Sequence, residues 1–143
     1  MQDLIYEFLK ISAKRACFFV LPSEEEGSGC IEVFSDSKTV TIKPLQIILQ
    51  TSEENSVRSY IHLLDAGFEI LHPIVLLNLL MLNQMPKEWR DMHIDFIGAW
   101  FYRPKYGLLT ISVDWFMNDW VIHYDRLSDD RKNRVVATAT LTN

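Results

Sequence analysis

Residues 72–83 read HPIVLLNLLMLN and form a strongly apolar run. Eight of these twelve residues are Ile, Val, Leu or Met, and the exceptions include Pro73 and Asn78. On a helix the apolar side chains would point in every direction, and such a helix must be covered all round by protein or by lipid. We therefore expect the central core helix of the fold here, with Pro73 in its first turn. Replacing Leu77 or Leu80 by alanine is expected to cost roughly 2–5 kcal/mol.

The length of this run disfavours a membrane-spanning role. The apolar segment 68–82 is broken by Glu69, His72 and Asn78. A helix that spans a bilayer needs roughly 20 predominantly apolar residues, whereas shorter runs more often belong to buried core helices. We therefore expect no membrane span.

Length and composition indicate one globular domain over residues 1–143. Hydrophobic residues make up 48% and charged residues 23%, which is the balance of an ordinary soluble protein. The net charge of −5 disfavours nucleic acid as the main partner, because phosphate binding needs a basic surface. It permits a basic protein partner, since complementary charge speeds association.

The N-terminus and the cysteines indicate a cytoplasmic protein. The first sixteen residues, MQDLIYEFLKISAKRA, carry Asp3 and Glu7 and no clean apolar core, so they do not form a secretory signal peptide. Cys17 and Cys30 flank an apparent hairpin in which Leu21 would face Cys30, so the two thiols would not lie opposite each other. A disulfide would be strained there, and we expect two buried, reduced thiols.

The N-terminal half is predicted to hold two helices and three short strands. Apolar residues at helical spacing indicate the helices, and β-branched or aromatic runs indicate the strands. The expected elements are a helix over residues 3–14, strands over 17–21, 30–34 and 39–43, and a helix that ends near residue 66. Thr51 and Glu54 have the spacing of a capping box that opens this last helix. Its expected buried stripe consists of Val57, Tyr60, Ile61 and Leu64.

The C-terminal half is predicted to be a four-stranded antiparallel meander. Its strands cover residues 93–102, 108–116, 119–126 and 134–141, and Met117 and Asn118 form a two-residue turn. This register pairs apolar residues on one face: Val113 with Ile122, Trp115 with Trp120, Ile97 with Val113, and Phe101 with Leu109. We therefore expect an α+β fold. The N-terminal hairpin extends or covers this sheet, and the N-terminal helix and a central hydrophobic helix pair pack on one face.

The other face of the predicted sheet gathers the most suggestive polar groups. The register places together Phe96 with Asp114, Gly98 with Ser112 and His123, and Trp100 with Thr110 and Asp125. The glycine would leave space, the aromatic rings would form walls, and polar groups would converge. An apolar pocket with a few convergent polar groups is typical of a ligand site. The binding candidates on this face are therefore Trp100, Ser112, Asp114, His123 and Asp125.

Other interpretations of this face stay open. A one-sided sheet also presents polar residues to water, and cross-strand polar pairs stabilise sheets without catalysis. Ser112 and His123 could meet as nucleophile and base, with Asp114 or Asp125 as the orienting carboxylate. The chain has neither a G-x-S-x-G elbow nor a glycine-rich phosphate loop, and its four histidines are dispersed. We therefore predict no catalytic residue, no metal ligand and no cofactor.

A second candidate binding region is the tip of the first predicted hairpin of the meander. Tyr102 and Tyr106 lie there with Arg103 and Lys105. Exposed Tyr and Arg are enriched in binding hot spots, and loops often carry function. The alternative is that Tyr106 folds back over its own hairpin.

These observations favour a non-catalytic, cytoplasmic protein-binding module, such as an inhibitor, an immunity-type antagonist or a dedicated chaperone. Its partner would be another protein, and a basic one would match the net charge. The alternative is a small-molecule-binding domain, or a simple hydrolase or isomerase, with a pocket around Trp100, Ser112, Asp114 and His123. A homodimer joined through a sheet face or an edge strand is the third option.

Overall fold

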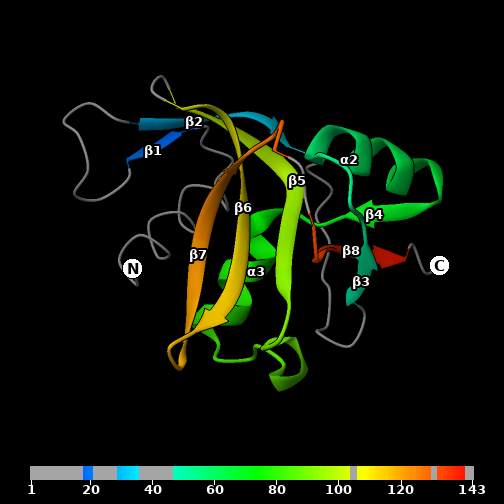
Figure 1. Cartoon of the computed structure of the whole chain (residues 1–143). Coiled ribbons are helices and arrows are strands. Elements are labelled where there is room, and N and C mark those ends of the chain that lie inside the picture. The colour runs from blue at the N-terminus through cyan, green and yellow to red at the C-terminus, as the bar shows by residue number, and fades with distance from the viewer. Residues whose placement is uncertain (1–17, 21–28, 36–46, 104–105, 130–131, 141–143) are drawn as a thin grey trace.

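The strands of this chain join in one mixed sheet that carries helices on its faces, which is an α+β architecture (Figure 1). The structure is a computed structural model, and it describes residues 18–20, 29–35, 47–103, 106–129 and 132–140. Within them the strands are β1 (Phe18–Val20), β2 (Gly29–Ser35), β3 (Ile47–Thr51), β4 (Phe68–Ile70), β5 (His93–Arg103), β6 (Gly107–Phe116), β7 (Asp119–Arg126) and β8 (Arg134–Thr140). The helices are α2 (Ser56–Asp65), α3 (Pro73–Met81) and the short 3-10 helix η2 (Lys87–Trp89). The predicted helix over residues 3–14, the predicted strand over 39–43 and Cys17 lie outside the described residues.

Three strands, β5, β6 and β7, form an antiparallel meander and lie side by side in Figure 1. Met117 and Asn118 turn the chain between β6 and β7, and their φ angles of 50° and 62° suit a two-residue hairpin turn. This turn fixes the register of the hairpin. The predicted pairs are confirmed here: Val113 with Ile122 and Trp115 with Trp120.

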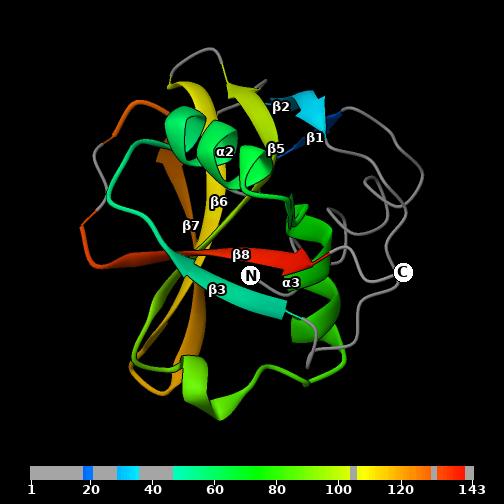
Figure 2. The same ribbon diagram turned by 90° about the vertical axis from the view of Figure 1, so that its right-hand side faces the viewer.

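The last strand, β8, does not continue the meander, and the prediction of a fourth antiparallel strand there is wrong. β8 pairs in parallel with the start of β5, where Arg134 lies beside His93, and it pairs antiparallel with β3 and β4. Figure 2 shows β3 and β8 side by side, crossing the direction of β6 and β7. The apolar pattern of residues 134–141 indicates a strand but not the strand that it meets. Val136 and Ala137 are both fully buried, so β8 is covered on both faces.

The first half of β5 also departs from the predicted register. Its pairing with β6 shifts between Phe96 and Phe101, which indicates a bulge in β5. The observed pairs are Ile94 with Val113, Asp95 with Ser112, Phe96 with Ile111, and Phe101 with Leu109. The last pair is as predicted, whereas Ile97 does not face Val113. Phe96 is buried in the core and does not lie beside Asp114 on the polar face.

Gly98 lies in this bulge because another part of the backbone passes close to it. Its N–H donates a hydrogen bond to the carbonyl oxygen of Leu71 (2.9 Å). A Cβ atom at this position would lie 2.6 Å from that oxygen and 2.7 Å from the backbone nitrogen of His72, which is closer than real Cβ contacts come. The space that the glycine was expected to leave for a ligand is therefore filled by the chain that connects β4 to α3.

The N-terminal hairpin extends the C-terminal sheet, because β2 pairs antiparallel with the second half of β5. β1 pairs with β2 so that Phe19 lies opposite Cys30, and the predicted position of Leu21 opposite Cys30 is wrong. β2 and β8 thus share one edge of β5, while β6 occupies the other edge.

Helix α3 is the predicted central helix, and it covers the face of the meander that lies behind the strands in Figure 1. Pro73 is in its first turn, and Nδ1 of His72 caps it by accepting a hydrogen bond from the N–H of Ile74 (2.9 Å). One core joins the helix to the sheet through buried side chains: Leu76, Leu77, Leu79, Phe96 and Phe101. The covering is incomplete, because Leu82 at the end of the helix is 64% exposed. None of the described helices is long and apolar enough to cross a membrane.

Helix α2 begins later than predicted. The side-chain oxygen of Asn55 accepts a hydrogen bond from the N–H of Arg58 (3.0 Å), and this contact caps the helix. Thr51 is the last residue of β3, so the predicted capping box at Thr51 and Glu54 is wrong. Glu54 instead forms an ion pair with His62 in the last turn of the helix (2.5 Å).

The side of α2 that packs on the sheet also differs from the predicted stripe. Its inward-facing side chains are Ser56, Ser59, Tyr60 and Leu63, and the last two pack against Ile70, Ile97 and Val136. The predicted stripe is therefore wrong except for Tyr60. Val57, Ile61 and Leu64 are 38%, 49% and 45% exposed. The sequence contains two apolar stripes one position apart, and helical spacing alone cannot tell which one meets the sheet.

The burial of α3 gives a direct test of its place in the core. Leu77→Ala is expected to lower the free energy of unfolding by about 2–5 kcal/mol, because the lost side chain leaves a cavity. Leu80→Ala is expected to cost less than first predicted, since Leu80 is only partly buried. The control Leu82→Ala removes the same atoms from an exposed position and should change the free energy by less than about 0.5 kcal/mol. Chemical denaturation measures the three values, and equal losses for Leu77 and Leu82 would contradict this placement.

Candidate functional site

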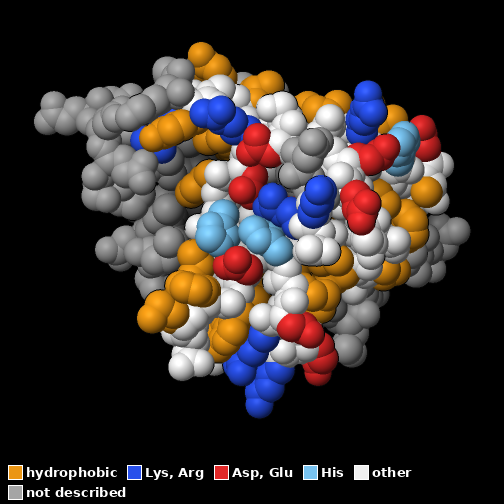
Figure 3. Space-filling view, viewed as in Figure 1, with side chains coloured by type: hydrophobic (Ala, Val, Ile, Leu, Met, Phe, Trp, Pro, Cys, Tyr) orange, Lys and Arg blue, Asp and Glu red, His pale blue; other side chains and the backbone are white. Residues whose placement is uncertain are grey.

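A group of charged and polar side chains, which we call the polar cluster, lies on the face of the sheet opposite α3. Its members are His93, Asp95, Ser112, Asp114, His123, Asp125 and Arg134. Residues two apart on a strand share a face, and the pairing of β6 with β7 sets Ser112 beside His123 as predicted. Figure 3 shows histidine, acidic and basic side chains together in the middle of this face.

Arg134 is at the centre of the polar cluster. Its Nη2 lies 2.5 Å from Oδ2 of Asp125 and 3.0 Å from Oδ1 of Asp95. The same nitrogen contacts Nε2 of His93 (2.7 Å) and Oγ of Ser112 (3.2 Å). Two carboxylates in a poorly solvated site would repel each other, and the guanidinium between them removes that repulsion. Arg134 therefore ties β8 to β5 and β7 at once.

The polar cluster favours an ionised Asp125 and a neutral His93. Burial alone favours the protonated form of Asp125, but the hydrogen bond from Ser112 and the charge of Arg134 outweigh it and hold the pKa of Asp125 below its ordinary value. Burial also disfavours the charged form of His93, and the charge of Arg134 adds to this effect, so the pKa of His93 is lowered. A neutral His93 agrees with its Nε2 accepting a hydrogen bond from Arg134.

Asp114 connects the two histidines of the polar cluster. Nε2 of His123 lies 2.8 Å from Oδ1 of Asp114, and Nδ1 of His93 lies 3.6 Å from its Oδ2. The two imidazole rings stack with centroids 5.4 Å apart. Asp114 and His123 are partly exposed, whereas Asp95 is fully buried. The polar cluster thus extends from a buried ion pair to an open histidine–carboxylate pair.

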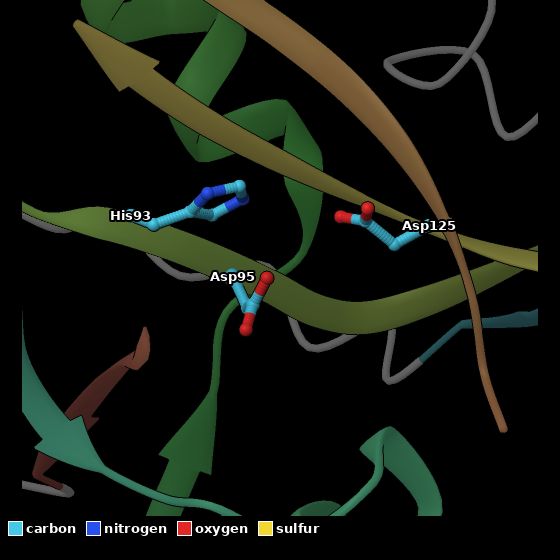
Figure 4. Close-up of side chains that lie close together, drawn as sticks. All are labelled: His93, Asp95 and Asp125. Atoms are coloured by element: carbon cyan, nitrogen blue, oxygen red, sulfur yellow. The ribbon is translucent and has the colours of Figure 1, made fainter. Parts of the chain in front are cut away.

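His93, Asp95 and Asp125 are the described residues that could hold a metal ion, and Figure 4 shows them close together on β5 and β7. Their ligating atoms lie within 4.8 Å of one another. However, Nη2 of Arg134 contacts all three side chains, so the guanidinium takes the place that a cation would need. We therefore assign these three residues to an ion-pair network.

The structure does not favour Ser112 as a nucleophile. Its Oγ lies 2.8 Å from Nε2 of His93, and not of His123 as the sequence analysis considered, and it donates a hydrogen bond to Asp125 (2.5 Å). Ser112 is fully buried, whereas a nucleophile must reach the electrophilic atom of its substrate. The hydroxyl therefore serves as a link in the hydrogen-bond network.

Three members of the polar cluster were not among the predicted site residues: His93, Asp95 and Arg134. The alternation of His93 and Asp95 on one strand was a signal for these two residues. Arg134 could not be found in this way, because it joins the cluster through the parallel pairing of β8 with β5.

Trp100 packs against α2 and does not form a wall of the polar face. Its ring centroid lies 5.9 Å from that of Tyr60 in an edge-on contact, and its Nε1–H donates a hydrogen bond to the carbonyl oxygen of Ile97 (3.1 Å). The bulge in β5 turns this part of the strand towards α2. The structure therefore does not bring Trp100 into one hollow with Ser112 and His123.

The hairpin tip between β5 and β6 is only partly the exposed surface that the sequence suggested. Tyr102 and Tyr106 are exposed, but Arg103 is buried. The Cζ atom of Arg103 lies 4.9 Å from the centre of the Tyr106 ring, so the tyrosine folds back over its own hairpin. This contact is the alternative that the sequence analysis left open for Tyr106.

A pocket of about 410 Å³ lies near this hairpin tip. Its described lining residues are Arg103, Tyr106, Leu109, Ile122, His123, Tyr124, Arg126 and Asp129. Three of the predicted binding residues, Arg103, Tyr106 and His123, come together here although the sequence placed them in two separate regions. Tyr124 and Arg126 were not among the predicted binding residues. The alternation along β7 indicates that Tyr124 is a core residue and that Arg126 is a solvated residue at the end of the strand.

Comparisons with protein-family models, with curated proteins and with solved structures found no match to this chain. The described residues offer three surface features that can contact another molecule. These are the open end of the polar cluster, the pocket near the hairpin tip, and the exposed apolar stripe of α2.

The ion-pair network predicts a non-additive pair of substitutions. Arg134→Met is expected to lower the free energy of unfolding by about 3–5 kcal/mol, because it leaves the carboxylates of Asp95 and Asp125 facing each other. Adding Asp95→Asn should recover part of this loss, since one negative charge is removed. The control Arg90→Met removes an arginine that stacks on Trp115, and it should cost less than about 1 kcal/mol. Urea denaturation of these three variants and of the single variant Asp95→Asn gives all four values, and additive losses for Arg134→Met and Asp95→Asn would contradict the network.

The lowered pKa of His93 predicts a loss of stability in mild acid. In the unfolded chain a histidine takes up a proton near pH 6.5, but the folded protein resists protonation of His93 until a lower pH. The unfolded state therefore binds more protons, and the free energy of unfolding should fall as the pH drops below about 6.5. In His93→Gln this part of the fall should be absent. Denaturation curves between pH 8 and pH 5 measure the free energy of unfolding of the wild-type chain and of His93→Gln. Parallel pH profiles of the two proteins would refute the assignment.

Proposed function

We propose that this protein is a non-catalytic protein-binding module of the inhibitor, immunity or chaperone type. The observation that carries the proposal is the exposed apolar stripe of α2, which consists of Val57, Ile61 and Leu64. These residues are spaced i, i+4 and i+7, so they form one continuous line along the helix. An amphipathic helix that binds an apolar groove of a partner contacts the groove through such a line of side chains.

The fold itself does not require this stripe. The opposite side of α2 already anchors the helix, since Tyr60 and Leu63 pack into the small core beside Val136. On that side Ser59 is buried, and its Oγ donates a hydrogen bond to the carbonyl oxygen of Glu54 (3.2 Å). Clustered aliphatic side chains that stay partly exposed and lie outside the core clusters are typical of an interaction surface.

Charge favours a partner of a different kind over a second copy of this chain. Two molecules that each carry a net charge of −5 repel each other, whereas a basic partner is attracted. The same charge disfavours nucleic acid. We therefore propose a basic protein with an apolar groove as the occupant of the stripe, and a cytoplasmic location is part of this proposal.

A small-molecule-binding domain is the second candidate function. The pocket near the hairpin tip supports it, because a volume of about 410 Å³ falls in the range of ligand sites. The location differs from the one expected at Trp100 and Ser112, since neither residue lines this pocket.

The stripe on α2 is tested by comparing captures from native lysate. Ile61→Asp should lose a partner that the wild-type chain recovers in stoichiometric amount, because a buried carboxylate has no place in an apolar interface. Leu82→Asp is the matched control, since it places the same charge at an exposed aliphatic position outside α2. It should recover the same partner as the wild-type chain.

Two results would contradict the proposed surface. One is recovery of the same protein by the wild-type chain and by Ile61→Asp in equal amount. The other is a wild-type chain that captures nothing and elutes as a dimer which Ile61→Asp converts to a monomer. Circular dichroism of the variants confirms that each is folded.

A further inference from the structure

Most of the described residues that line the pocket near the hairpin tip lie on the apolar face of the sheet, whereas His123 belongs to the polar face. Phe101, Leu109 and Arg126 are in register across β5, β6 and β7, so their side chains share the apolar face. Arg103 follows Phe101 by two residues, and Tyr124 precedes Arg126 by two, so both belong to the same face. Two guanidinium groups are therefore brought to the end of a face that is otherwise apolar.

Among the described lining residues of the pocket, basic groups outnumber acidic ones, whereas the chain as a whole is acidic. The described lining holds Arg103 and Arg126 against one carboxylate, Asp129, while the chain as a whole has a net charge of −5. Within the described residues no ion pair joins Arg126 to Asp129. The guanidinium of Arg126 is thus available to a ligand in solution.

The two arginines differ in how they are held. Arg103 is buried, and its guanidinium lies over the ring of Tyr106, so its position in the wall is fixed before any ligand arrives. Arg126 is exposed at the end of β7 and can close over a ligand. A planar guanidinium donates paired hydrogen bonds to carboxylate and phosphate oxygens, which an ammonium group cannot do with the same geometry.

The remaining lining suits a flat apolar body. Tyr106 and Tyr124 supply aromatic rings, and Leu109 and Ile122 supply aliphatic surface. An aromatic ring of a ligand can stack or pack edge-on against such side chains. The pocket therefore combines an apolar part with an anion-binding part.

From this arrangement we propose that the pocket binds a small aromatic or similarly flat organic anion, with its carboxylate or phosphate group held by the exposed guanidinium of Arg126, while the buried Arg103 adds positive charge to the wall. The site is separate from the stripe on α2, so it does not depend on the proposed protein partner. It lies at the hairpin tip, and it shares only His123 with the polar cluster.

Titration of the full chain with matched probes tests this site. Benzoate and phenyl phosphate carry the two candidate anions, and benzamide has the same ring and nearly the same shape as benzoate without the charge. At least one anion should bind with a dissociation constant of about 1 mM or lower, and benzamide should bind at least about tenfold more weakly. Tighter binding of phenyl phosphate would identify a phosphate site, and tighter binding of benzoate a carboxylate site.

Arg126→Gln should weaken binding of the preferred anion at least about tenfold, which is the effect of one lost charge-assisted hydrogen bond. The same variant should leave the weak binding of benzamide unchanged. Arg90→Gln is the control, because Arg90 stacks on Trp115 and does not line the pocket. Failure of both anions to bind, or binding that survives Arg126→Gln, would overturn the proposal. Neither result would affect the test of the stripe on α2.

Discussion

The fold depends on one ionic contact, the guanidinium of Arg134 between the carboxylates of Asp95 and Asp125. β8 is the strand that links β3 and β4 to β5, so the position of Arg134 at its start fixes where two parts of the sheet meet. A buried carboxylate without a cation is costly, and this cost selects the parallel pairing in which Arg134 reaches Asp95. The contact also determines the chemistry of the polar cluster, because it takes the cation position beside His93 and keeps Ser112 inside a network.

The parts of the fold that the sequence predicts correctly are those set by local geometry. The β6–β7 hairpin has its predicted register because a two-residue turn fixes it, and α3 begins at Pro73 because a proline suits a first turn. The parts that fail depend on distant contacts. The partner of β8 depends on a charge in β5, and the bulge at Gly98 depends on the backbone at Leu71. Neither is visible in the spacing of residues along one strand.

The candidate sites show the same division. Ser112 and His123 were correctly placed side by side by strand register, but the contacts of Ser112 with His93 on β5 and Arg134 on β8 depend on other strands. Arg103 and Tyr106 were recognised as a pair at one tip, yet the pocket that they line needs Arg126 from β7. Three exposed residues of α2 were predicted to be buried, since two apolar stripes are present on one helix and only the tertiary fold chooses between them. Composition and spacing thus identify the residue types of a surface, and the assembled sheet decides which of them meet.

Native-state hydrogen exchange of Arg134→Met is the most direct measurement of the role given to Arg134. The account predicts that the amides of β8 lose protection selectively, because their strand is no longer tied to β5 and β7, while the amides of the β6–β7 hairpin keep most of theirs. Equal loss of protection in β8 and in the β6–β7 hairpin, or none in either, would contradict the claim that this ion pair holds the two parts of the sheet together.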